Sequence, residues 1–316
     1  MTIVIPVYNE AESLIPLNDA LQRVMSEMTI PWEAIFVDDG SMDESLAVLE
    51  KMASNDPHHI RVISFRRNFG QTAAIVAGID HSQGDVIIFM DADLQNDPAD
   101  IPMMLEKINQ GYDVVSGWRV NRQDTFFTRK LPSQIANWLI STVTGVRLHD
   151  YGCTLKAYRR EVLADFHLYG EMHRFIPAYA ASVGAKIVEV PVHHHARRFG
   201  RAKYGLGRTL KVILDLFTVK FLMSYANKPI YLFGGAGVVL IAISILTLIA
   251  LVLRRIWYEE HLIRSPLLQL STMLFIIGVQ SILMGFVAEL LIRTYHESQH
   301  KPIYTIRKVI NEKKPE

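Results

Sequence analysis

Two aspartates in the first hundred residues are spaced for metal chemistry. Asp91 and Asp93 directly follow the apolar run Val86–Met90. Residues two apart in an extended chain point to the same side, so both carboxylates, together with Gln95, can face one point. Oxygen ligands of this kind suit Mg²⁺ or Mn²⁺. The Asp91-Ala92-Asp93 triplet therefore predicts a divalent cation, which would neutralise the charge that develops on a leaving diphosphate.

Basic residues are concentrated in the second half of the domain, where they could receive an anion. Arg119 follows the apolar run DVVSGW, and Arg129 lies just before Ser133, at the start of the helix-like PSQIANWLISTVTG. Arginine and helix N-terminal amides are good phosphate ligands. A second basic stretch, VHHHARRFGRAKYG, contains Arg197 and Lys203. These residues predict an anionic acceptor, and a solvated basic face is the alternative.

The three consecutive histidines in this stretch, His193 to His195, raise the question of a second metal site. Consecutive residues on a strand alternate between its two faces, so three of them cannot bind one ion. We interpret the segment instead as a strand end whose basic residues lie near anionic lipid headgroups.

The elements that must position these residues alternate in type along the chain. Short runs rich in Val, Ile and Phe are followed by helix-like stretches, which predicts a mostly parallel sheet covered by helices. The expected strands are Ile3–Val7, Ala34–Val37, Arg61–Phe65 and Val86–Met90, and the expected helices are Glu12–Met28, Asp43–Ala53 and Gln71–Asp80. A capping box at Ser41-Met42-Asp43-Glu44 would start the second helix. Ligands on such sheets bind at the carboxyl ends of the strands.

Several function classes are excluded by what the sequence lacks. The turn after the first strand reads Pro-Val-Tyr-Asn-Glu, without the Gly-x-Gly-x-x-Gly of dinucleotide-binding enzymes, and there is no Gly-x-x-x-x-Gly-Lys phosphate loop. The single cysteine, Cys153, excludes an internal disulfide framework and a cysteine-based zinc site within one chain.

Two long apolar segments near the C-terminus predict membrane spans. Residues 230–253 contain no charged residue, and the only charged residue in the segment 267–292 is Glu289. Lys and Arg are more numerous on the outer flanks than in the connecting loop, which predicts that both termini are cytoplasmic. Buried core helices are the alternative. Glycines 234, 235 and 237 on the first span could pack against neighbouring chains, which favours a homo-oligomer.

The predicted organisation has six parts. They are a cytoplasmic catalytic domain (residues 1–205), an amphipathic juxtamembrane helix (206–228), a first transmembrane helix (229–253), a short external loop (254–266), a second transmembrane helix (267–292) and a cytoplasmic tail (293–316). The alternative for the juxtamembrane helix is a final helix packed on the soluble domain. The expected location is the inner (plasma) membrane.

The motifs IVIPVYNE, FVDDGSMDES and MDADLQNDP resemble those of the inverting family-2 glycosyltransferases of the GT-A fold. More narrowly, the chain resembles the polyprenyl-phosphate hexose synthases, which include dolichyl-phosphate mannose synthase and the bacterial bactoprenol glucosyltransferases. The motifs cover residues 1 to about 228, and the two-span topology covers the rest. The Arg-x-x-Gly-x-Ser-Lys pattern of the family is matched at Arg197, Gly200 and Lys203, whereas Ala202 replaces the serine.

The resemblance implies roles for individual residues. The donor nucleotide would be surrounded by Pro6, Tyr8, Glu10, Asp38, Asp39, Gln71 and Asp91. Asp91, Asp93 and Gln95 would hold the metal. The acceptor phosphate would be bound by Arg119, Arg129, Ser133 and Lys203, with Asp93, Asp150 and Arg197 at the reacting centre. A lipid phosphate is already anionic and needs no general base, so Asp150 is expected to position other groups.

The expected reaction is transfer of glucose from UDP-glucose to undecaprenyl phosphate, with Mg²⁺ or Mn²⁺ and inversion at the anomeric carbon. GDP-mannose and an aminoarabinose donor remain open as alternatives. A polysaccharide synthase is disfavoured because the chain has no Gln-x-x-Arg-Trp motif. A non-catalytic scaffold is disfavoured by the intact Asp91 and Asp93. The expected partners are the nucleotide-sugar, the lipid phosphate and the membrane, with no nucleic acid.

Overall fold

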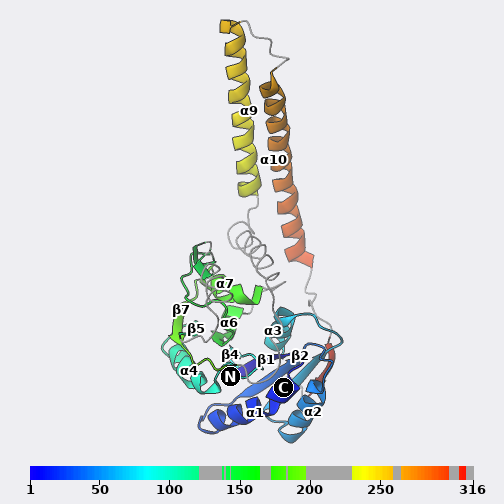
Figure 1. Cartoon of the computed structure of the whole chain (residues 1–316), viewed down its shortest axis with the longest axis vertical. Coiled ribbons are helices and arrows are strands. Elements are labelled where there is room, and N and C mark those ends of the chain that lie inside the picture. The colour runs from blue at the N-terminus through cyan, green and yellow to red at the C-terminus, as the bar shows by residue number, and fades with distance from the viewer. Residues whose placement is uncertain are drawn as a thin grey trace. The chain divides into compact units, whose positions relative to one another are not determined.

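A mixed sheet forms the centre of the first part of the computed structural model (Figure 1). The structure describes residues 1–120, 137–138, 140–142, 144–163, 172–182, 184–196, 230–258, 265–298 and 306–310. The chain divides into two compact units, one of Met1–Leu216 with Pro302–Glu316, and one of Phe217–Lys301. Arg129, Ser133, Arg197, Lys203 and the predicted juxtamembrane helix 206–228 lie outside the described residues.

The described strands form an eight-stranded sheet in the order β7-β5-β6-β4-β1-β2-β3-β8. The strands are β1 (Thr2–Val7), β2 (Glu33–Asp38), β3 (Ile60–Phe65), β4 (Val86–Phe89), β5 (Val114–Trp118), β6 (Lys156–Arg159), β7 (Ile187–Pro191) and β8 (Ile306–Ile310). The β4-β1-β2-β3 half is parallel, as is the β5–β7 pair. Strand β6 runs antiparallel to β4 and β5, and β8 runs antiparallel to β3. The predicted α/β class with a mostly parallel sheet is confirmed.

The helices of this unit alternate with the strands. They are α1 (Ala11–Ser26), α2 (Ser45–Asn55), α3 (Gln71–Asp80), α4 (Ile101–Asn109), α6 (Arg160–Leu163) and α7 (Ile176–Ser182), with 3-10 turns η1 (Pro98–Asp100) and η3 (Met172–Phe175). The capping box predicted at residues 41–44 is wrong. Helix α2 begins at Ser45, and Ser41 Oγ instead accepts a hydrogen bond from the backbone N–H of Asn9 at 2.9 Å.

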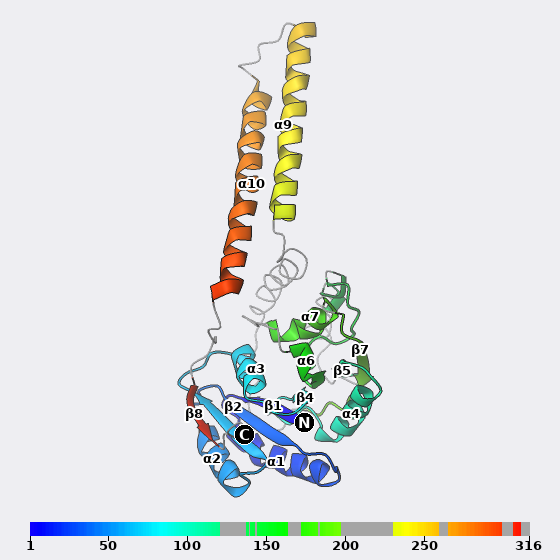
Figure 2. The ribbon, with the colours of Figure 1, turned by 180° about the vertical axis from the view of Figure 1, so that it is seen from behind.

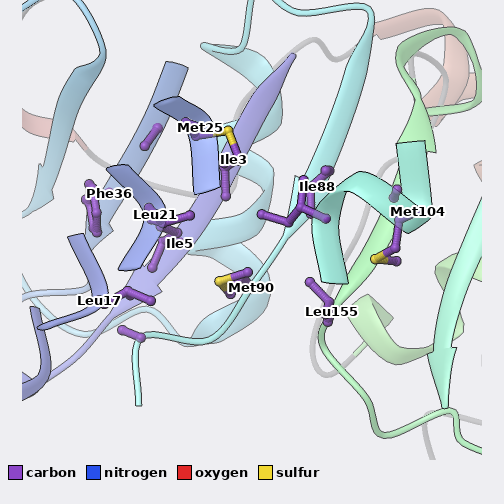
Figure 3. Packing of buried hydrophobic residues seen from close by; sticks show 14 of the residues in the cluster. Ile3, Ile5, Leu17, Leu21, Met25, Phe36, Ile88, Met90, Met104 and Leu155 are labelled. Atoms are coloured by element: carbon purple, nitrogen blue, oxygen red, sulfur yellow. The ribbon is translucent and has the colours of Figure 1, made fainter. Parts of the chain in front are cut away.

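Alternating side chains of the central strands pack against helices on opposite faces of the sheet. Ile3, Ile5 and Phe36 face α1, whose Leu17 and Leu21 complete this cluster (Figure 3). On the other face, Ile35, Val37 and Ile63 pack against the alanines of α3. Figures 1 and 2 show α1 and α2 on one side of the sheet and α3 on the other. Because the strands are buried on both faces, they read as continuous apolar runs.

The second unit contains two long apolar helices, α9 (Ile230–Tyr258) and α10 (Pro266–Ser298). Both are long and apolar enough to cross a membrane, and only 17% of the most apolar window of each is buried. Core helices of a soluble domain would be buried, so that alternative does not describe them. Helix α9 extends past the predicted end of the first span at residue 253, and α10 extends past 292. The predicted loop 254–266 and tail 293–316 are therefore partly helical, and the tail also supplies β8.

The two helices contact each other through small residues. A Cβ added to Gly237 would lie 2.5 Å from the carbonyl oxygen of Gly278, so the backbones approach closely at this point. Ser244 and Ser271 each donate a side-chain hydrogen bond to the other's backbone carbonyl oxygen, at 2.7 and 2.9 Å. Gly237 therefore packs within its own hairpin, whereas an added Cβ at Gly235 would meet open space.

Candidate active site

The acidic centre of the site lies at the carboxyl end of β4. Both carboxylate oxygens of Asp91 accept hydrogen bonds, Oδ1 from Gln71 Nε2 at 2.9 Å and Oδ2 from Thr154 Oγ1 at 2.7 Å. Gln71 is the first residue of α3, and Thr154 precedes β6. Each carboxylate oxygen has two lone pairs, so both retain capacity for a further ligand. The Asp91 carboxylate is thus held in one orientation with an oxygen lone pair left on each side.

The second aspartate of the triplet, Asp93, is buried, and its Oδ1 accepts a hydrogen bond from the backbone N–H of Gln95 at 3.1 Å. The residue between Asp93 and Gln95 is Leu94, which has a φ of 60°, a left-handed conformation that is strained for a leucine. Burial, followed by the charge of Asp93, raises the pKa of Asp91. The two carboxylates repel each other, and the strained turn keeps the backbone that carries them in place. A bound cation would relieve the repulsion, so the arrangement suits a cation site.

The residues present fit a divalent cation that is only partly coordinated by protein. Among the described residues, no group of three or more His, Cys, Asp or Glu side chains is arranged to hold a metal. Mg²⁺ commonly binds through one or two carboxylates, with water and substrate phosphates completing its coordination. The side-chain nitrogen of Gln95 contacts the carbonyl oxygen of His195 at 3.4 Å. A metal-binding role for Gln95 therefore stays a prediction.

A buried ion pair lies beside the acidic centre. Arg119, directly after β5, donates from Nε to Asp150 Oδ2 at 2.6 Å and from Nη2 to Asp150 Oδ1 at 2.9 Å. The side chains are 13% and 7% exposed. Such a two-point contact fixes the plane of the guanidinium. The pair has the geometry that a positioning role of Asp150 requires, while the catalytic role itself stays a prediction.

Residues 150–154 connect this ion pair to Asp91. The segment begins at Asp150 and ends at Thr154, which donates to Asp91. The buried ammonium of Lys156 donates to the backbone carbonyl oxygens of Tyr151 and Cys153 and so holds the segment in place. Burial lowers the pKa of Lys156. At the other end, Glu189 Oε1 of β7 accepts from the backbone N–H of Asp150 at 3.0 Å.

A pocket of about 320 Å³ lies where β2 and β3 end. Its lining comprises Tyr8, Asp38, Gly40, Ser41, Met42, Leu46, Phe65, Arg66, Arg67 and Asn68. Two of the residues predicted to contact a nucleotide, Tyr8 and Asp38, are therefore brought together in one cavity. Gly40, with a φ of 69°, allows the turn to approach the backbone of Arg67, because a Cβ added there would lie 2.4 Å from the Arg67 carbonyl carbon.

The other predicted nucleotide ligands do not line this pocket. Asp39 accepts hydrogen bonds from the backbone N–H groups of Phe69 and Gly70, at 2.6 and 2.9 Å. Burial raises the pKa of Asp39 to about 6. Through its hydrogen bonds with Phe69 and Gly70, Asp39 holds the loop that follows β3. Pro6 lies within β1, and Glu10 precedes α1, where its backbone N–H donates to Ser45 Oγ.

Sequence reasoning missed several residues of this site. Thr154 and Glu189 contact Asp91 and Asp150 across 63 and 39 positions of the chain, so no local pattern reveals either contact. The Arg66-Arg67 pair is different, because its place at the end of a predicted strand was visible in the sequence. Basic residues at that edge could have been added to the predicted donor pocket.

The chain is similar to known proteins over nearly its whole length. Residues 2–166 match the glycosyl transferase family 2 model. The chain is 42% identical over 315 residues to a dodecaprenyl-phosphate galacturonate synthase from Rhizobium johnstonii, which covers 99% of this chain and 93% of the relative. It is 38% identical over 313 residues to an undecaprenyl-phosphate 4-deoxy-4-formamido-L-arabinose transferase from Enterobacter sp., covering 98% and 94%.

The fold is also similar to that of solved structures. A glucosyl-3-phosphoglycerate synthase from Mycobacterium tuberculosis, solved with Mn²⁺, uridine diphosphate and phosphoglyceric acid, superposes with a TM-score of 0.54. It is 17% identical and covers 69% of this chain and 77% of its own. This likeness shows the GT-A-like fold alone. The family match and the near full-length relatives show more, namely that the chain belongs to glycosyl transferase family 2, in its group of polyprenyl-phosphate sugar transferases.

Proposed function

We propose that this chain transfers a sugar from a nucleoside diphosphate donor to a polyprenyl phosphate, with inversion at the anomeric carbon, at the cytoplasmic face of the membrane. The proposal rests on the contacts of residues 150–154, which connect an acidic site to a site that contains an arginine. The acidic pair Asp91 and Asp93 lies on one side, and the Arg119–Asp150 ion pair lies on the other.

On the donor side, the pocket containing Tyr8 and Asp38 would take the nucleoside. Asp91 and Asp93 would hold Mg²⁺ or Mn²⁺ next to it. When bound, the cation would neutralise the charge that develops on the leaving diphosphate. Gln71 and Thr154 fix the Asp91 carboxylate before the donor arrives, so no reorganisation of that group is needed during the reaction.

On the acceptor side, the attacking atom is an oxygen of the lipid phosphate. It is ionised near neutral pH, so the protein need not remove a proton from it. The negative charge of the lipid phosphate must instead be brought next to the acidic pair Asp91 and Asp93, which requires cationic side chains. Arg119 would supply one, held in orientation by Asp150. The predicted ligands Arg129, Ser133, Arg197 and Lys203 would add the rest.

The two apolar helices would form a membrane hairpin. Strand β8 follows them in the sequence and pairs with β3 in the same sheet as the preceding strands. The chain therefore leaves the catalytic unit before Ile230 and is back in it by Ile306. Two crossings place both flanks on one side of the membrane, in agreement with the Lys and Arg distribution that predicts a cytoplasmic catalytic unit.

The identity of the sugar is the finer part of the proposal. The resemblance alone favours glucose from UDP-glucose. The relatives named above are instead a galacturonate synthase and a 4-deoxy-4-formamido-L-arabinose transferase. Since the galacturonate synthase is the more identical of the two, we place galacturonate first among the donors and keep glucose, formamidoarabinose and GDP-mannose as competitors.

Transfer by the purified full-length protein tests the proposal. Each labelled donor would be incubated with undecaprenyl or dodecaprenyl phosphate and Mg²⁺ or Mn²⁺, and label in the organic phase would be counted. We expect one donor to be strongly preferred and EDTA to abolish transfer. Asp93→Asn should lose most activity, whereas Asp19→Asn, an exposed carboxylate on α1, should not. No transfer from any of these donors would refute the proposal.

A further inference from the structure

Two of the three consecutive histidines are paired with carboxylates of the segment that follows the metal triplet. His193 Nδ1 lies 2.7 Å from Asp100 Oδ1, and the backbone N–H of His193 donates to Asp100 Oδ2 at 2.7 Å. His195 Nε2 lies 2.8 Å from Asp97 Oδ2. The imidazoles meet different carboxylates, so they do not converge on one metal ion.

Backbone contacts join the same two segments. The N–H of His195 donates to the carbonyl oxygen of Gln95 at 2.9 Å, and Asn96 and His194 form an antiparallel bridge. Residues 192–196 therefore lie alongside residues 95–100, which continue directly from Asp91 and Asp93. We call this paired region the histidine clasp, defined by His193 with Asp100 and His195 with Asp97.

The burial of the Asp100 carboxylate indicates that the clasp is built into the fold. The Asp100 side chain is 5% exposed, although the His193 side chain that it binds is 75% exposed. A buried carboxylate is costly unless it accepts hydrogen bonds, and both Asp100 oxygens accept from His193. The Asp97 side chain is 29% exposed and also accepts from the N–H of Ala99 at the start of η1.

The position of the clasp in the sequence indicates its use. One end, residues 95–100, follows the metal triplet, and the other ends at Ala196, immediately before residues 197–203, the part of the second basic stretch that we call the acceptor loop. We propose that His193 and His195 are positioning residues that fasten residues 192–196, which precede the acceptor loop in the sequence, to residues 95–100, which follow the metal triplet, and that this fastening supports acceptor binding. This inference rests on the proposed function, and it gives the histidines a role that involves neither a metal nor lipid headgroups.

Isosteric replacements make the test specific. The amide nitrogen of asparagine can take the place of His Nδ1, and that of glutamine the place of His Nε2. We expect His193→Ala/His195→Ala to raise the KM for polyprenyl phosphate about tenfold, since charge-assisted hydrogen bonds are lost from both pairs. The donor KM should change less than about twofold. His193→Asn/His195→Gln should restore most of the acceptor affinity, and exposed His58→Ala should change neither KM.

Two further measurements separate the clasp from folding and from the proposed function. His195→Ala alone leaves only the partly exposed Asp97 without its partner, so this variant should fold and show a smaller rise in acceptor KM. Hydrogen–deuterium exchange of peptides spanning residues 95–100 and 192–196 should accelerate in the alanine variants, whatever the donor is. Unchanged exchange, unchanged acceptor KM, or equal changes in both KM values would overturn the inference. Absence of transfer by the wild type would instead refute the proposed function.

Discussion

Replacing Asp150 by asparagine distinguishes a positioning residue from a catalytic base. Asp150→Asn removes the charge and keeps the size of a side chain that Arg119 contacts at 2.6 and 2.9 Å. Removing one partner of a buried ion pair costs about 3–5 kcal/mol. The asparagine oxygen retains one hydrogen bond from Arg119, and a hydrogen bond involving a charged group contributes about 1.5–3 kcal/mol. We therefore expect the free energy of unfolding to fall by about 2 kcal/mol, the difference between these two contributions.

The expected effect on activity appears mainly in acceptor binding. Once Arg119 is no longer fixed at two points, the KM for polyprenyl phosphate should rise about tenfold to about a hundredfold, since each 1.4 kcal/mol is about a factor of ten. The donor KM should stay constant. The pH profile of kcat should keep its shape, because the acceptor phosphate needs no deprotonation near neutral pH. Steady-state transfer of labelled sugar, varied separately in donor and acceptor, measures all three quantities.

A double-mutant cycle supplies the control. Arg119→Met alone should leave Asp150 buried without its cation, whereas the double variant leaves neither charge. The double variant should therefore lose less stability than the sum of the two single variants. The reasoning is refuted if Asp150→Asn abolishes turnover while stability and the binding affinities for both substrates, measured by calorimetry, remain those of the wild type. In that case Asp150 acts as a base.

Three other perturbations probe different parts of the chain. Because burial raises the pKa of Asp91, protons should compete with the cation, so metal affinity should weaken from about pH 7 to about pH 5; calorimetry showing constant affinity would contradict this. Gly40→Ala forces a Cβ to 2.4 Å from the Arg67 backbone at a positive φ and should raise the donor KM about tenfold, with the acceptor KM unchanged. Gly237→Leu places a side chain against the Gly278 carbonyl and should lower the Tm in detergent, whereas Gly235→Leu, in open space, should not.

The sequence allowed the first half of the sheet to be predicted, but not the second. Strands β1 to β4 match the predicted runs within one or two residues, because they are buried on both faces and appear as apolar segments. Strand β6 begins with the buried Lys156, so its sequence does not look like that of a central strand. Strand β8, with the sequence IRKVI, lies beyond two apolar helices, and only tertiary pairing identifies it as part of the sheet.

The candidate site was predictable in its location and less so in its partners. The rule that ligands bind at the carboxyl ends of parallel strands drew attention to Asp38 and Asp91, which the structure places at the carboxyl ends of β2 and β4. The same rule cannot supply contacts between distant loops. Arg119 was expected to face an anionic acceptor, yet its nearest anion is Asp150, 31 positions away. The contact forms because β6 returns antiparallel beside β5.

These contacts change how the donor and acceptor sides are related. In the sequence, the aspartates that would hold the leaving group and the arginines that would receive the lipid appear as separate features. In the structure, residues 150–154 contact both, since Asp150 fixes Arg119 and Thr154 fixes Asp91. A shift of this segment must therefore displace Arg119, on the proposed acceptor side, and Asp91, on the proposed donor side, together. The reaction requires both phosphates to be aligned with one anomeric carbon, and a shared segment sets that alignment more directly than two independent loops could.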